Sequence, residues 1–134
     1  MKYKFIEDLT SDVMFEAYGK TLKELFTNSA EAMFTIICKN VEPKKPRLVE
    51  VKGNNLEELM IAWLQELIAL VDTEEMFFSK FEIIEIDETH VRARCFGEPI
   101  TPEKGETVVK AVLFYKFKLE KTEKGYIARF GCDI

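Results

Sequence analysis

The residues of this chain that could do chemistry are mainly carboxylates near its two ends. Asp8 and Asp12 lie on either side of a short turn, and Asp133 precedes Ile134, whose α-carboxylate is a second negative group. If the first and last strands of the fold pair, these oxygen atoms converge. Converging carboxylates repel one another, so protons or a cation must neutralise them. Oxygen ligands without His or Cys favour a hard ion, and both Ca²⁺ and Mg²⁺ satisfy this chemistry.

The same spacing has a purely structural interpretation. In this alternative the C-terminal residues form a frayed tail, and Asp12 accepts backbone N–H groups in an Asx-type turn. Spacing alone leaves both interpretations open.

Other reactive side chains give little support for an enzyme. The one histidine, His90, stands at the mouth of a predicted hairpin, and a single His excludes a site with several His ligands. Cys38, Cys95 and Cys132 are scattered, which excludes a disulfide framework and predicts small core residues in a reducing compartment. The chain has no P-loop, dinucleotide-binding, zinc-protease or serine-hydrolase motif.

Two charged clusters have structural interpretations beside functional ones. Asp72-Thr73-Glu74-Glu75 ends the second predicted helix and is typical of a solvated turn. A group of lysines on a predicted late hairpin either protects an edge strand from aggregation or forms a docking surface for an acidic or RNA-bearing partner. These lysines are Lys110, Lys116, Lys118, Lys121 and Lys124.

Composition predicts a soluble globular protein with a single domain over residues 1–134. Apolar residues make up 47% of the chain and charged residues 32%. The 19 Lys and Arg against 24 Asp and Glu give a net charge of −5, so the chain is a poor candidate for holding nucleic acid by itself. Glutamates interrupt its longest apolar region, 56–71, and no secretory signal is recognisable, so we expect a cytoplasmic protein without a membrane contact.

The elements that must position these residues follow from hydrophobic periodicity. Two amphipathic helices are predicted, one after a Thr21–Glu24 capping box and ending near Asn40, the other after an Asn55–Glu58 cap. Alternating apolar residues predict the strands. The resulting fold class is α+β, with two helices packed on a mainly antiparallel β-sheet. The predicted strands are 2–6, 13–18, 47–52, 77–86, 90–96, 108–119 and 126–133.

The sequence resembles the archease family over nearly its whole length. The resemblance rests on short fragments that occur in the family's order, in a chain of family length. These fragments are Leu9-Thr10-Ser11-Asp12-Val13, Ala17-Tyr18-Gly19, Ala32-Met33-Phe34, Asp72-Thr73-Glu74, Val109-Lys110-Ala111-Val112-Leu113-Phe114 and Asp133-Ile134.

The resemblance implies a non-catalytic activator of the GTP-dependent tRNA-splicing RNA ligase RtcB. Archeases promote guanylylation of that ligase and its multiple turnover. By position, the family's metal ligands correspond to Asp12, Asp133 and the terminal carboxylate of Ile134, which implies a divalent cation as cofactor. RNA would be met only through the ligase. An older view of the family, as a chaperone-like modulator of RNA-processing and RNA-modification proteins, remains the alternative.

Four positions depart from the family's pattern. Leu9 stands where a His is frequent, and Ser11 replaces an Ala. Leu113 replaces a Thr, and Tyr115 stands where a His often follows the aromatic residue. Roles of those polar groups therefore do not carry over, whereas the carboxylates are retained.

A third interpretation is a stand-alone enzyme or small-ligand-binding domain that uses a pocket in the sheet. The lack of a nucleophile–base pair and of a cofactor motif argues against it. Binding of a small molecule without a partner protein would favour it.

Overall fold

The computed structural model describes residues 1–8 and 12–134, and seven strands and two helices lie within them. Their order along the chain is the order predicted from the sequence. The elements are β1 (Tyr3–Asp8), β2 (Asp12–Gly19), α1 (Leu22–Ile37), β3 (Lys45–Lys52), α2 (Leu56–Thr73), β4 (Met76–Ile86), β5 (His90–Pro99), β6 (Ala111–Thr122) and β7 (Gly125–Asp133).

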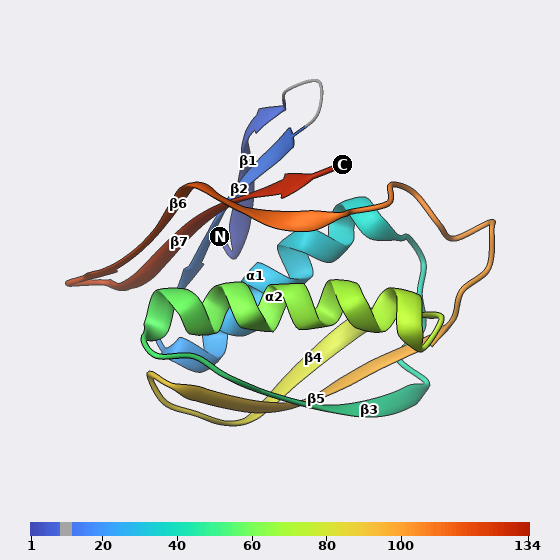
Figure 1. The fold of residues 1–134 in the computed structure, drawn as a ribbon, viewed down its shortest axis with the longest axis horizontal. Coiled ribbons are helices and arrows are strands. Elements are labelled where there is room, and N and C mark those ends of the chain that lie inside the picture. The colour runs from blue at the N-terminus through green and yellow to red at the C-terminus, as the bar shows by residue number, and fades with distance from the viewer. Residues whose placement is uncertain (9–11) are drawn as a thin grey trace.

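The two helices lie between two antiparallel sheets (Figure 1). One sheet has the strand order β1-β2-β7-β6 and the other the order β3-β5-β4. Helix α1 packs on β2 and β4, and α2 packs on β6 and β3, so each helix contacts both sheets. The predicted α+β class is confirmed, with the strands divided into two sheets because the helices have apolar residues for both sides.

Side-chain caps fix where the helices begin. The Thr21 hydroxyl accepts the N–H of Glu24 at 3.2 Å, and the Glu24 carboxylate accepts the N–H of Lys20 at 2.6 Å. In α2, Asn55 Oδ1 accepts the N–H of Glu58 at 2.9 Å. Both predicted caps are confirmed. In the first, the Glu24 carboxylate accepts the N–H of Lys20, the residue before the N-cap Thr21, where a standard capping box would use the N–H of Thr21 itself.

Helix α1 ends earlier than the predicted end near Asn40. Its last residue is Ile37, because Cys38 is extended, with φ −155°, and forms a bridge to Gly105. Asn40 then takes a positive φ of 53° in the turn towards β3. The bridge between Cys38 and Gly105 therefore ends the helix at Ile37.

The core lies around the helices. Trp63 is fully buried, and its Nε1 donates to the carbonyl oxygen of Phe26 at 3.0 Å. All three cysteines are buried and free, as the sequence predicted. Burial raises the pKa of each thiol to about 12, so the thiols stay protonated at neutral pH. Neither described helix is long and apolar enough to cross a membrane.

Strands from the two ends of the chain lie at the centre of the four-stranded sheet. β2 and β7 pair with one another, and β1 and β6 form the sheet edges. A tight turn joins β6 to β7, where Gly125 has a φ of 132° that favours glycine. The register of β6 against β7 shifts between Leu113 and Lys118. The first and last parts of the chain therefore meet, which is the condition for convergence of the terminal carboxylates.

Candidate metal site beside the C-terminal strand

Two of the predicted ligands lie directly opposite one another. Asp12 is the first residue of β2, Asp133 is the last residue of β7, and the two are partners in the antiparallel register. Residues in this relation have Cβ atoms about 4.5–5.5 Å apart and point to the same side of the sheet. The structure thus brings Asp12 and Asp133 together, and Ile134 follows at once.

Both carboxylates lie on the outer face of the four-stranded sheet. Val13 and Phe15 on β2, and Cys132 on β7, are buried in the core, so the alternate positions point away from the helices. Asp12 and Asp133 are partly exposed there. The backbone N–H of Lys110 donates to the Asp133 carbonyl oxygen at 2.8 Å, which holds the end of β7 against the segment before β6.

A matched charge pair lies on the same face of the same two strands. Glu16 is the register partner of Arg129, and Arg129 Nη2 donates to Glu16 Oε2 at 2.9 Å. The hydroxyl of Tyr18 also donates to Glu16 at 2.6 Å. These hydrogen bonds, that of Tyr18 first, lower the pKa of the Glu16 carboxyl, while burial and the Glu16 charge raise the pKa of Tyr18 to about 12.

Asp12 and Asp133 have no such compensation in the part of the chain that the structure describes. Neither side chain has a hydrogen bond or an ion pair with a described residue. Like charges directly opposite in an antiparallel pair are destabilising. A cation between them would remove that repulsion.

Two opposed carboxylates are donors of the kind that a hard divalent ion prefers. Among the side chains that the structure describes, no group of three or more His, Cys, Asp and Glu is suited to a metal ion. To hold an ion, Asp12 and Asp133 would need a further donor, such as the α-carboxylate of Ile134. All of these donors are carboxylate oxygens, which suit Ca²⁺ or Mg²⁺ and not a thiolate or imidazole metal.

The other residues singled out from the sequence add no described side-chain donor to the pair Asp12–Asp133. The segment Leu9-Thr10-Ser11 lies outside the described residues, and so does the side chain of Asp8. Leu113 is partly buried opposite Gly131, and Tyr115 is exposed. His90 begins β5, as predicted, and its Nε2 lies 2.5 Å from a Glu50 carboxylate oxygen. This surface pair belongs to the three-stranded sheet, not to the sheet that bears Asp12 and Asp133.

The lysine-rich hairpin is an edge of the four-stranded sheet. Lys118 pairs with Glu120 at 2.6 Å, and Lys121 lies over the ring of Tyr126 at 5.8 Å. β6 is an outermost strand, which supports the interpretation that its lysines protect an edge.

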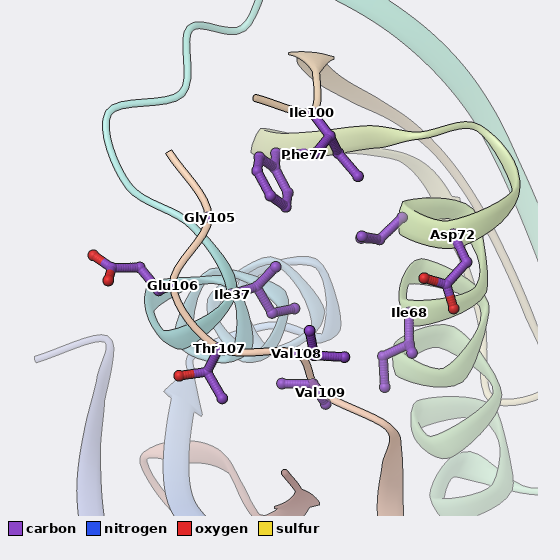
Figure 2. Close-up of a pocket in the computed structure, with 11 residues that line it drawn as sticks. Ile37, Ile68, Asp72, Phe77, Ile100, Gly105, Glu106, Thr107, Val108 and Val109 are labelled. Atoms are coloured by element: carbon purple, nitrogen blue, oxygen red, sulfur yellow. The ribbon is translucent and has the colours of Figure 1, made fainter. Parts of the chain in front are cut away.

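A cavity of about 210 Å³ was not foreseen from the sequence. It lies between α1, α2 and the 100–109 segment, and Figure 2 shows the side chains of Ile37, Ile68 and Phe77 directed towards a common space. The available signal was the pair of exposed apolar residues Ile100 and Val108 in an otherwise polar loop.

Comparison with known proteins identifies the family of this chain. A profile described as the archease protein family matches residues 3–134. Protein archease of Sulfurisphaera tokodaii is 39% identical, with 99% of each chain covered. Protein archease of Methanosarcina acetivorans is 40% identical, with 99% of this chain and 96% of that protein covered.

Two solved structures have the same fold. The solution structure of protein 1598 from Methanobacterium thermoautotrophicum has a TM-score of 0.80, 32% identity and 98% coverage of both chains. The crystal structure of an archease from Thermotoga maritima, described as a possible chaperone, has a TM-score of 0.62 at 15% identity and covers 96% of this chain and 93% of that one. The second likeness shows the fold alone.

Proposed function

The chain belongs to the archease family, and we propose that it is a non-catalytic activator of the GTP-dependent tRNA-splicing RNA ligase RtcB. In this proposal the protein promotes guanylylation of the ligase and its multiple turnover in the cytoplasm. It meets RNA only through the ligase, in keeping with its net charge of −5. The observation that carries the proposal is the register pair Asp12–Asp133, two carboxylates that face one another without an ion pair to any described residue.

The residues that would hold the divalent cation are Asp12, Asp133 and the α-carboxylate of Ile134. When bound, such an ion supplies positive charge that neutralises the charge developing in nucleotidyl transfer. The chain's own part is to present these oxygen atoms from a rigid support. The paired strands β2 and β7 provide it, since they are in antiparallel register over the whole of β2, from Asp12–Asp133 to Gly19–Tyr126.

An activator of this kind needs no nucleophile or general base. It acts by binding the reactive conformation of the ligase more tightly than the unreactive one. A preference of about 3 kcal/mol changes the ratio of the two conformations about 150-fold. The buried thiols, with pKa values raised to about 12, are unsuited to nucleophilic chemistry, which agrees with this role.

The test is RNA ligation by RtcB over many turnovers with GTP and a divalent cation. Wild-type protein is compared with Asp12→Asn, Asp133→Asn and a variant that lacks Ile134. The matched control is Glu16→Gln, which changes a carboxylate on the same face of the same strand as Asp12. We expect the three site variants to fold and to lose activation at every protein concentration, while the control activates. Normal turnover with the folded site variants would contradict the metal proposal.

A chaperone-like scaffold for RNA-processing proteins is the second candidate. The specific observation in its favour is the exposure of several large apolar residues, among them Leu48, Val108 and Phe114. In this case the carboxylates are only structural. Asp133→Asn would then activate normally, and Val108→Ser or Phe114→Ser would abolish activation.

A further inference from the structure

The cavity between the helices has walls that hydrogen bonds hold in place. The N–H groups of Glu106 and Thr107 donate to the carbonyl oxygens of Ile37 and Ile36, each at 2.9 Å, and so tie the 100–109 segment to the end of α1. At the other side of the loop, the Glu98 carboxylate accepts the Lys104 ammonium at 2.6 Å. That ammonium and the N–H of Glu42 lower the pKa of the Glu98 carboxyl. The cavity is therefore preformed.

Its inner surface is apolar, and the charge at its rim is negative. Ile37, Ile68 and Val109 line it from α1, α2 and the loop. Asp72 lies at the rim and has no ion pair with a described residue. The second acidic residue there, Glu106, points away from the space in Figure 2, in agreement with its ion pair to Lys39 at 3.9 Å. No Lys or Arg is among the described lining residues.

The volume of the cavity suits one side chain. A dry cavity of about 150 Å³ in another protein accepts benzene, and ligand pockets for whole small molecules measure about 300–1,000 Å³. A space of about 210 Å³ lies between these values and suits one Leu, Met or Phe side chain.

The mouth of the cavity continues as an apolar surface. Val108 is 76% exposed and Ile100 is 40% exposed, and both line the cavity. A free small molecule inside would leave Val108 in water, whereas a polypeptide segment would cover it. Solvent-exposed apolar residues beside a preformed pocket are typical of protein–protein contacts.

We propose that this cavity receives one apolar side chain of the ligase, and that a basic residue next to that side chain pairs with Asp72. The inference rests on the proposed function, and it identifies the surface by which the protein binds the ligase. The loop that lines the cavity continues to the end of β7: Val109 lines the cavity, and the N–H of the next residue, Lys110, donates to the Asp133 carbonyl oxygen. In this proposal one partner contacts the cavity and the end of β7 together.

The test separates binding from activation. The dissociation constant between the full chain and the ligase is measured by calorimetry for wild type, Asp72→Lys, Val108→Asp and the cavity-filling Ile68→Trp. Glu66→Lys is the matched control, because it makes the same charge change on α2 outside the cavity lining. We expect at least a ~10-fold increase in the dissociation constant for the three cavity variants and none for the control. At saturating concentration the cavity variants should activate as wild type does.

The outcomes also separate this inference from the function on which it rests. If wild type binds the ligase and folded Asp72→Lys and Val108→Asp bind equally well, the cavity is not the contact and only this inference fails. If wild type does not bind the ligase, both fail. If the variants change self-association in sedimentation and not ligase binding, the occupant is a second copy of this chain, which also overturns the inference. Because Ile68 is buried, its variant counts only when its circular dichroism matches wild type.

Discussion

Charged side chains are arranged differently on the outer faces of the two sheets. On the three-stranded sheet, opposite charges face one another across β4 and β5: Glu82 is the register partner of Arg94, at 2.9 Å, and Glu85 is the partner of Arg92, at 3.4 Å. On the four-stranded sheet, Glu16 and Arg129 follow the same rule. Two register pairs of described side chains carry like charges: Lys118–Arg129, whose members each form an ion pair with a glutamate, and Asp12–Asp133, which form none with a described residue. The second pair lies at the end of β7, next to Ile134.

In the proposed function, this difference has a reason, because an unpaired carboxylate can bind a cation and a paired one cannot. Matched cross-strand charges contribute roughly 0.2–1 kcal/mol each, and like charges in the same relation oppose folding. Even the like-charged register partners Lys118 and Arg129 each have a glutamate counter-charge, so stability alone gives no reason to oppose two aspartates without one. Local departures from consistent design are expected at functional sites. We therefore interpret the mismatch as the preorganised part of a cation site.

The largest expected effect comes from replacing the like-charged pair Asp12–Asp133 with a pair of opposite charges. Asp133→Lys places an ammonium opposite Asp12, as Arg129 lies opposite Glu16. We expect loss of ligase activation to the basal rate, because the cation ligands are gone and a fixed positive charge remains. The free energy of unfolding should rise by about 0.2–1 kcal/mol without added cation. Ligation assays and urea unfolding measure the two quantities, and retained activation would show that no cation is needed there.

A smaller effect is expected from breaking the matched pair beside it. Arg129→Gln removes the guanidinium that bonds to Glu16 and should reduce stability by about 0.5–1 kcal/mol at neutral pH, because Arg129 is nearly half exposed. The pKa of the Glu16 carboxyl is lowered in the folded protein, so this stabilisation is present above its ordinary pKa. It is lost as the pH falls through the lowered value.

Urea unfolding of wild type and Arg129→Gln between pH 2.5 and 7 tests this dependence. The difference between the two proteins should shrink towards acid pH, while activation of the ligase stays unchanged at pH 7. A difference that grows on acidification would mean that the pair does not stabilise the fold.

The smallest effect is expected on the other sheet. Arg94→Gln removes the partner of Glu82, and both side chains are nearly half exposed. Water and salt screen such pairs, so we expect a loss of at most about 0.5 kcal/mol and no change in activation. Thermal unfolding at low and high salt measures it. An effect larger than that of Arg129→Gln would mean that the two sheets do not differ as described.

Much of the fold follows from local sequence. The caps at Thr21 and Asn55 and the alternation within each strand rest on neighbouring residues, and these features were predictable. The end of α1 was not, because Cys38 leaves the helix to pair with Gly105, a residue far along the chain. The division of the strands into two sheets likewise depends on how both helix faces pack.

The candidate site was predictable in its residues but not in its geometry. Pairing of the first and last strands could be expected, yet a register shifted by one residue would place Asp12 and Asp133 on opposite faces. That register depends on packing of Phe15 and Phe130 in the core, with ring centroids 5.5 Å apart. The cavity at Ile68 and Phe77 needs three distant segments and has no local signature.

If Asp12 and Asp133 face one another in order to hold a cation, a cation must stabilise the folded protein through them. Thermal unfolding of the full chain is followed with increasing Ca²⁺, and separately Mg²⁺, for wild type, Asp133→Asn and the Glu16→Gln control. A ligand at 100 times its dissociation constant stabilises the folded state by about 2.7 kcal/mol. We expect a concentration-dependent rise in Tm for wild type and Glu16→Gln and none for Asp133→Asn. An equal rise in all three proteins, or no rise in wild type with either ion, would contradict this expectation.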